Sequence, residues 1–335
     1  MSLPTWLVFP TERTVVHYHE QGGVMSHHNN DDLVLPVIGE LALSSSHRDC
    51  PPSSKNFPDG SRYRIEIPSI ESPGLMKIVI AEAKTHNLKI SRVSQGSGIW
   101  LLKDDEITEM LDLGKANDIE VCLFVGPRAE WDLGAQATSP GGSALAPSLH
   151  GTRQLTQAIR ELVHACDLGL RCVLVADLGL MMLIKQLKER GDLPLDLKIK
   201  TSAVLPCSNP ASAKVFEDYG ATSLNVAADL SIEDLSDLRK AVDVFIDLYI
   251  ESPDSLGGIL RYYDIPEIIR VASPVYLKFG LRNSVSLYPY GDHLKSVGEG
   301  ITREKVRRAA IGMEILKNYQ QTDLTVEKIP KLKSL

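Results

Sequence analysis

The sequence is poor in cysteine, and the cysteines it has are scattered. Five occur in 335 residues, they form no C-x-x-C pair, and they stand at Cys50, Cys122, Cys166, Cys172 and Cys207. An odd, dispersed set argues against a disulfide framework and against a four-thiolate metal site. It favours a reducing compartment, so we expect a cytoplasmic protein.

Long apolar runs and blocks of like charge are also missing. No stretch approaches the ~20 residues that span a bilayer, since the best candidate, Val242–Ile250, contains Asp243 and Asp247. The formal net charge is −7, without the basic stripe that phosphate tracking requires. These absences argue against a membrane or a nucleic acid as partner. They favour a small-molecule or peptide-like substrate, and they leave a homo-oligomer open.

The first sixty residues differ in composition from the rest of the chain. They hold five histidines whose spacing matches no standard metal site, together with serine and proline runs. We predict a flexible N-terminal extension over residues 1–60, whose role the sequence leaves open, and a C-terminal tail over 321–335.

Residues 61–320 alternate short β-branched runs with helical stretches. The expected strands are Tyr63–Ser69, Lys89–Gln95, Glu120–Arg128, Arg171–Asp177, Lys198–Pro206, Thr222–Ala228, Val242–Glu251 and Val275–Leu281. Alternation of this kind implies a parallel sheet, and eight units over about 250 residues match a single (β/α)8 TIM barrel. Helix starts are predicted at Ser72-Pro73, Asn209-Pro210 and Ser231.

Polar residues interrupt these strands near their C-terminal ends, where barrel enzymes build their sites. Alternation places Asp247, Tyr249 and Glu251 on one side of the seventh strand. The candidate catalytic residues are Glu66, Asp247, Glu251 and Lys278. The candidate substrate-binding residues are Arg92, Gln95, Arg128, Lys200, Asn225, Tyr249, Arg282 and Asn283. Long loops follow the third and eighth strands, on the same face.

Several chemistries fit this set. The three carboxylates suit acid–base work or, if a divalent metal ion is bound, oxygen ligation by Glu66, Asp247 and Glu251. Lys278 or Lys200 suits imine formation in a lyase, aldolase or isomerase. A structural ion-pair ladder, as in a non-catalytic ligand-binding barrel, is the remaining alternative.

The segment from Asn209 carries a family resemblance. It reads Asn209-Pro-Ala-Ser-Ala-Lys-Val-Phe-Glu-Asp-Tyr-Gly220-Ala, followed by Leu224-Asn-Val-Ala-Ala-Asp-Leu-Ser231-Ile-Glu-Asp-Leu. This resembles the collagenase-like peptidase family of unassigned catalytic type, in which an asparagine-led helix, a glycine turn, a strand and a serine-led helix follow one another. The resemblance implies a TIM barrel and a peptidase-like hydrolase acting on a small anionic or peptide-like substrate.

The chain departs from that family at the hallmark that follows the next strand. Where the family has a His-Gly-Ala-type segment with cysteines, this sequence has Tyr249-Ile-Glu-Ser-Pro-Asp-Ser-Leu-Gly257-Gly258, and no cysteine follows Cys207. We therefore expect a divergent member without the iron–sulfur cluster that some relatives hold. Whether any other cofactor is bound is left open.

Overall fold

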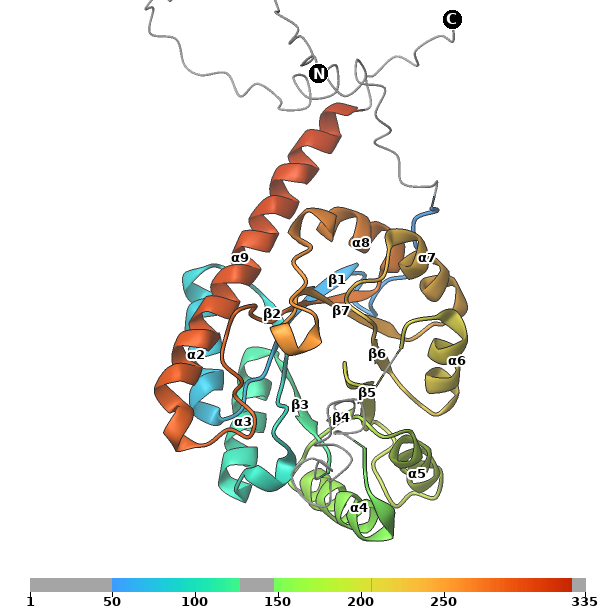
Figure 1. The fold of residues 1–335 in the computed structure, drawn as a ribbon, viewed down its shortest axis with the longest axis vertical. Helices are drawn as coiled ribbons and strands as arrows, with labels where there is room; N and C mark the ends of the chain where they lie inside the picture. The colour runs from blue at the N-terminus through green and yellow to red at the C-terminus, as the bar shows by residue number, and fades with distance from the viewer. Residues whose placement is uncertain (1–49, 127–147, 206, 327–335) are drawn as a thin grey trace, which may run out of the picture. The chain divides into compact units, whose positions relative to one another are not determined.

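A parallel barrel forms the body of the protein. The computed structural model describes residues 50–126, 148–205 and 207–326, the last seven of them as backbone only. Within these residues eight strands close in sequential order, each beside its neighbours in the chain (Figure 1). They are β1 (Tyr63–Pro68), β2 (Ile90–Ser94), β3 (Glu120–Phe124), β4 (Cys172–Val175), β5 (Lys198–Thr201), β6 (Ser223–Asn225), β7 (Phe245–Glu251) and β8 (Val275–Phe279). The predicted (β/α)8 barrel is confirmed.

Helices ring the strands, as Figure 1 shows. They are α2 (Pro73–Thr85), α3 (Asp104–Asn117), α4 (Gly151–Asp167), α5 (Leu178–Glu189), α6 (Pro210–Asp218), α7 (Ile232–Ala241), α8 (Ile265–Ala272) and α9 (Lys295–Val326), with 3-10 turns η1 (Ile99–Leu101), η4 (Asp254–Leu256), η5 (Tyr262–Asp264) and η6 (Asp292–Leu294). In the parts of the chain that the structure describes, no helix has the length and apolar character needed to cross a membrane.

The predicted helix starts are confirmed. The side chains of Ser72, Asn209 and Ser231 accept backbone N–H groups at the first turns of α2, α6 and α7. Each cap satisfies a donor that the helix leaves open, and proline at the start of α2 and α6 costs no hydrogen bond.

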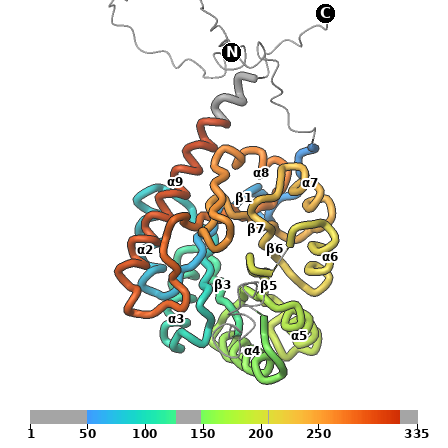
Figure 2. Tube along the Cα trace, viewed as in Figure 1, coloured from blue at the N-terminus to red at the C-terminus, as the bar shows by residue number. Residues whose placement is uncertain are grey.

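The last helix is longer than the sequence predicted. The sequence predicts this helix over Arg303–Tyr319, but α9 begins at Lys295 and continues to Val326. It lies beside α2, which brings the end of the barrel against its start (Figures 1 and 2).

Period-two alternation divides the strand residues between two environments. Side chains such as Val93, Leu123, Ile199 and Leu277 point outward and form the core with the helices. The opposite positions point into the barrel. There β3 and β4 contribute an apolar group that includes Cys122, Phe124 and Cys172. The other strands contribute charged and polar side chains, which are described below.

The segment before β1 packs against the N-terminal ends of the strands. Phe57 is buried, with its ring 4.7 Å from that of Phe245 and 5.2 Å from that of Tyr276. The N–H of Ser53 bonds to the carbonyl of Arg270 at 2.8 Å. Residues 50–60 were assigned to the extension, and these contacts attach them to the barrel. The remainder of the predicted extension lies outside the described residues.

Candidate functional site

Five charged side chains meet inside the barrel, and we call them the interior cluster: Glu66, Arg92, Lys200, Asp247 and Lys278. All five are buried. Arg92 Nη1 lies 3.1 Å from Asp247 Oδ1 and 3.4 Å from Glu66 Oε2. Lys200 Nζ contacts Glu66 and lies 3.1 Å from Asp247 Oδ2. Five strands therefore bring together residues that are far apart in the chain, because inward positions of a closed sheet face one axis.

Serine and glutamate side chains complete the hydrogen bonding of the cluster. Ser94 donates to Glu66 at 2.8 Å, and Ser223 donates to Asp247 at 2.6 Å. Arg92 Nε donates to Glu120 at 2.6 Å, on the side toward the N-terminal ends of the strands. The two buried carboxylates thus have several partners each, as buried charges require.

Lys278 differs from the other cations of the cluster. Its Nζ lies 3.7 Å from Glu66 Oε1, at the outer limit of an ion pair, and 4.0 Å from the centroid of the Tyr249 ring. Lys200, by contrast, contacts both carboxylates. Arg92 and Lys200 each have carboxylate oxygens within 3.1 Å, Arg92 through Glu120 as well as Asp247, so Lys278 is the most weakly paired of the three cations.

The pKa values of the two lysines reflect their unequal ion pairing. Burial, together with the charge of Lys200, lowers the pKa of Lys278 to about 7, against the pull of Glu66. Burial also acts on Lys200, but Asp247 and Glu66 outweigh it and raise the pKa of that lysine. Burial would raise the pKa of Glu66, yet Lys200, Lys278 and Arg92 hold it below its usual range. Lys278 is therefore the amine of this cluster that is available unprotonated near neutral pH.

Glu251 does not join Glu66 and Asp247, which corrects the alternation that we expected for β7. The register between β7 and β8 shifts between Tyr249 and Glu251. The Glu251 carboxylate accepts the Tyr262 hydroxyl and the N–H of Arg282, and it lies 3.6 Å from Arg308 Nη1 on α9. Glu251 thus connects β7 to η5, to α9 and to the segment after β8.

The proposed metal ligands do not come together either. The two carboxylates of the cluster face Lys200 and Arg92, and Glu251 faces α9. Among the residues that the structure describes, no group of three or more His, Cys, Asp or Glu side chains is arranged to hold a metal ion. Glu66, Asp247 and Glu251, which the sequence offers as ligands if a divalent metal ion is bound, thus do not form one group in the described part of the chain.

The remaining predicted residues occupy different places. Gln95 is buried and bonds to the backbone of Gly98, so it shapes a turn. Arg282 Nε lies 3.6 Å from Asp254, and the N–H of Asn283 donates to the same carboxylate. Asn225 is buried on β6, and its Oδ1 has no hydrogen-bond partner within the described part of the chain. Arg128 and most of the loop after β3 lie outside the described residues.

A cavity of about 120 Å³ opens at the C-terminal end of the barrel, and we call it the mouth cavity. Its wall includes Ser69, Tyr249, Ser286, Tyr288 and Lys305. Tyr249 contacts both this cavity and the amine of Lys278. Sequence reasoning missed Lys305, because its position on an amphipathic helix resembles that of any surface lysine. From the sequence, Ser69 stands out only as the end of the first expected strand, and Tyr288 only as part of the long loop after the eighth strand.

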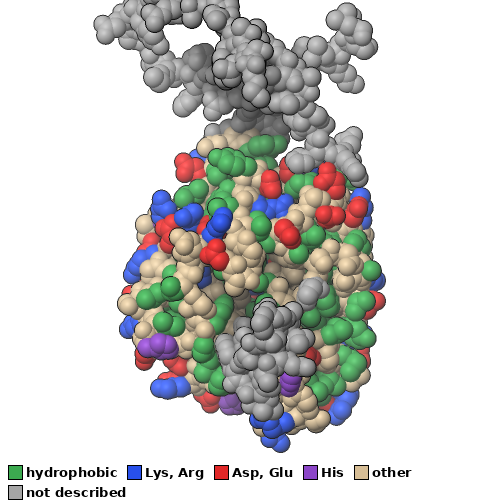
Figure 3. Space-filling model, in the orientation of Figure 1, with side chains coloured by type: hydrophobic (Ala, Val, Ile, Leu, Met, Phe, Trp, Pro, Cys, Tyr) green, Lys and Arg blue, Asp and Glu red, His purple; other side chains and the backbone are tan. Residues whose placement is uncertain are grey.

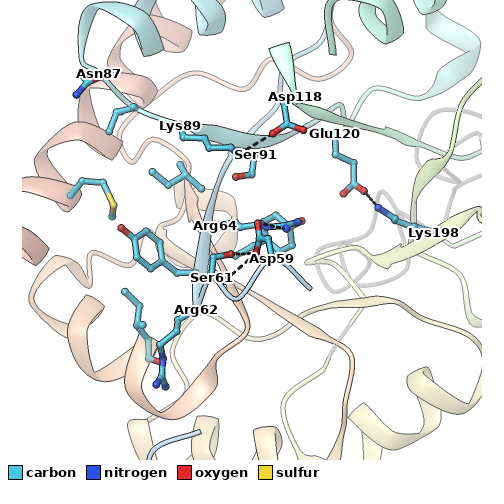
Figure 4. A pocket seen from close by; sticks show the side chains of 16 residues that line it. Asp59, Ser61, Arg62, Arg64, Asn87, Lys89, Ser91, Asp118, Glu120 and Lys198 are labelled. Carbon is cyan, nitrogen blue, oxygen red and sulfur yellow. Dashed lines mark hydrogen bonds and ion pairs between the residues drawn. The ribbon is translucent and has the colours of Figure 1, made fainter. Parts of the chain in front are cut away.

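A larger cavity, of about 830 Å³, lies at the opposite end of the barrel. Figure 4 shows its polar residues, most of which are paired with one another: Arg64 with Asp59, Lys89 with Asp118, and Lys198 with Glu120. These three pairs account for six of its charged side chains, and Lys278 is not part of its lining. We therefore place the candidate site at the C-terminal end, as in other barrels of this fold.

Charge on the outer surface does not compete with this assignment. On the face drawn in Figure 3, acidic and basic side chains are interspersed among apolar ones, with no broad area of one sign. The weak pairing of Lys278 inside the barrel is the more specific electrostatic feature.

Comparison with known proteins supports the predicted resemblance over part of the chain. Residues 146–252 match the model of Peptidase family U32. A curated relative, tRNA hydroxylation protein P of Escherichia coli (strain K12), is 26% identical over 98 residues. That match covers 29% of this chain and 20% of the relative, so the chain spans only about a fifth of the length of that protein. The resemblance recognised from Asn209 onward is confirmed.

Two solved structures align with this chain at low identity. The U32 peptidase Mk0906 is 16% identical, with a TM-score of 0.41 and coverage of 72% of this chain and 99% of that one. Thiamine phosphate pyrophosphorylase from Pyrococcus furiosus is 12% identical, with a TM-score of 0.39 and coverage of 76% and 96%. The described residues thus form a TIM barrel, and residues 146–252 of it are similar to Peptidase family U32.

Proposed function

We propose that this protein is an enzyme that forms an imine between Lys278 and a small anionic carbonyl compound, and that it cleaves or isomerises that compound beside the carbonyl carbon. The observation that carries the proposal is the unequal pairing in the interior cluster. Lys200 forms ion pairs with both Glu66 and Asp247. The amine of Lys278 lies 3.7 Å from Glu66, at the outer limit of an ion pair. Its pKa of about 7 leaves a large fraction of the amine unprotonated at neutral pH.

The chemistry follows from these neighbours. The unprotonated amine adds to the carbonyl carbon, and loss of one water leaves a carbon–nitrogen double bond in place of the carbon–oxygen one. Protonation of that nitrogen by water gives a cation, and the electron pair of a neighbouring C–C or C–H bond moves toward it to leave an enamine. The carbon fragment departs as a carbonyl compound, with its hydroxyl proton passing to water, or the C–H proton itself passes to water. Protonation of the enamine carbon and addition of water to the C=N bond then release the product and restore the amine. Glu66, held ionised by Lys200 and Arg92, stabilises the cationic imine electrostatically. Its lowered pKa makes it a poor proton donor.

Borohydride trapping tests the proposal. The full-length protein is incubated with pyruvate, glyoxylate or dihydroxyacetone phosphate, and each sample is reduced and mapped by peptide mass. We expect a reduced adduct on Lys278 that disappears in Lys278→Met. Lys188→Met is the matched control, because burial lowers the pKa of that lysine too, on α5 outside the barrel. Adducts distributed over exposed lysines, with none on Lys278, would reject the imine mechanism.

A peptidase-like hydrolase is the second candidate. The family match over residues 146–252 favours it, since that segment carries Lys200, Asn225 and Asp247. The carboxylate of Asp247 is a residue type that can serve as a general base toward water. Cleavage of a mixed peptide library by the wild-type protein, absent in Asp247→Asn, would support this function. Saturable binding of a small carbonyl acid without turnover would instead indicate a ligand-binding barrel.

The proposed setting is a reducing compartment such as the cytoplasm. All five cysteines lie among the described residues, and all are free. Recovery of the native protein with five alkylatable thiols would agree with this setting, and a disulfide in protein isolated from its source would contradict it.

A further inference from the structure

Lys305 is a buried lysine that faces the mouth cavity without an ion pair. It lies on α9, is 4% exposed, and lines the cavity. Its Nζ donates to the carbonyl of Pro68 at 2.8 Å. No carboxylate of the described residues lies within 4.0 Å of it, although several other buried cations have such a partner.

Glu71 is the carboxylate that acts electrostatically on Lys305, but its oxygens accept hydrogen bonds from other groups. Glu71 accepts the N–H groups of Gly96 and Ser97, both at 2.9 Å. The charge of Glu71 favours the protonated form of Lys305, but burial opposes it more strongly. The pKa of Lys305 is therefore lowered to about 8. A buried ammonium group with no carboxylate in direct contact is unfavourable, and an anion that enters the cavity supplies such a contact.

Hydroxyl groups around the cavity add hydrogen-bonding capacity. Ser69 and Tyr288 share a hydrogen bond of 2.5 Å, and Ser286 accepts the N–H of Tyr288 at 3.3 Å. The volume of about 120 Å³ holds roughly four water-sized groups, since each water occupies about 30 Å³ in the liquid. One carboxylate or phosphate group fits such a space, whereas a folded peptide segment does not.

We propose that the mouth cavity binds the anionic group of the substrate, a carboxylate or a phosphate, with Lys305 as its counterion. The anion site itself is inferred from Lys305 and the cavity, and only the identification of the anion as part of a substrate rests on the proposed function. Tyr249 contacts both the cavity and Lys278, so an anion held by Lys305 places the rest of a small molecule next to the amine. Arg282, the arginine that the sequence suggested for this role, pairs with Asp254 instead.

Titration calorimetry of the full-length protein with sodium sulfate and with sodium acetate, at constant ionic strength, tests the proposal. We expect one of the two anions to bind saturably and Lys305→Met to weaken it at least about tenfold, as the loss of a charge-assisted bond predicts. Tighter binding of sulfate would identify a phosphate site, and tighter binding of acetate a carboxylate site. Lys240→Met, which removes an exposed lysine paired with Asp237, should bind like wild type.

Two further measurements keep the outcome decisive if Lys305→Met does not fold. First, the affinity of the wild-type protein should fall about tenfold per pH unit above the pKa of about 8, because only the protonated lysine attracts the anion. Neither probe titrates there, so an affinity that does not change with pH would overturn the proposal. So would the failure of both anions to bind.

Secondly, Lys278→Met should retain anion binding. If it does while no borohydride adduct forms in the wild-type protein, the imine mechanism fails and the anion site stands. If the adduct forms on Lys278 but Lys305→Met binds the anion like wild type, the anion site fails and the imine mechanism stands.

Discussion

The amine of Lys278 lies 4.0 Å from the centroid of the Tyr249 ring, and that ring forms part of the wall of the mouth cavity. One aromatic side chain therefore connects the reactive nitrogen to the space that a small molecule can enter. Tyr249 and Lys278 are register partners on β7 and β8, so the barrel itself fixes this contact.

Replacement of Tyr249 should open the route to the amine. We expect Tyr249→Leu to raise severalfold the rate at which formaldehyde and cyanoborohydride methylate Lys278 at alkaline pH, because a smaller side chain leaves room for the reagent. Tyr249→Phe keeps the ring and should react like wild type. Peptide mass mapping measures the rate at Lys278 alone, and equal rates in all three proteins would show that reagents arrive by another path.

Lys200 should control the titration of Lys278. In the wild-type protein, methylation of Lys278 should follow a pH curve with a midpoint of about 7. Lys200→Met removes a positive charge from the cluster, so that midpoint should rise by about one pH unit, and labelling near neutral pH should slow by up to roughly tenfold. Lys188→Met serves as the control for loss of a lysine elsewhere. An unchanged midpoint in Lys200→Met would show that burial alone sets the pKa of Lys278.

The lowered pKa of Lys278 has a consequence for stability. In the unfolded chain a lysine titrates near 10.4, whereas Lys278 in the folded protein titrates at about 7. Between these values the unfolded state binds more protons, so the free energy of unfolding should rise with pH over this range. Below about pH 7 the native state carries the full cost of a charged Lys278, on the order of several kcal/mol.

The variant Lys278→Met removes the free-energy cost of a buried charged lysine, so its stability relative to wild type measures that cost. The variant should be more stable than wild type at about pH 6.5. The difference should shrink toward pH 10, because Lys278 is then neutral in the folded protein and the pH approaches the pKa of lysine in the unfolded chain. Urea unfolding at several pH values measures the difference. A variant that is less stable than wild type at low pH would mean that Lys278 is a required cation of the ion-pair network.

Glu251 should matter for stability rather than for the reactivity of Lys278. It accepts hydrogen bonds from Tyr262 and Arg282 and lies beside Arg308. Glu251→Gln should lower the free energy of unfolding by about 1–3 kcal/mol, the usual effect of leaving buried polar groups unsatisfied. The pH midpoint of Lys278 methylation should stay where it is. A large change in that midpoint would show that Glu251 acts on Lys278, and it would support a catalytic role for Glu251.

The sequence by itself determined the architecture and a set of polar candidates that includes the five residues of the interior cluster. Strand and helix periodicity predicted the barrel, and local cap chemistry placed the starts of α2, α6 and α7. Polar residues at inward strand positions, such as Glu66, Arg92 and Asp247, stood out because a barrel strand is otherwise apolar. These signals are local, so a single sequence carries them.

Only the tertiary structure decided which charges meet. The register shift in β7 turned Glu251 toward α9, and alternation along one strand cannot reveal a shift that arises between two. Lys305 reaches the cavity from a helix whose place depends on closure of the whole barrel. The difference between Lys200 and Lys278 rests on distances to Glu66 and Asp247 across the barrel axis. Electrostatic interactions depend on separation and burial, and both are properties of the assembled fold.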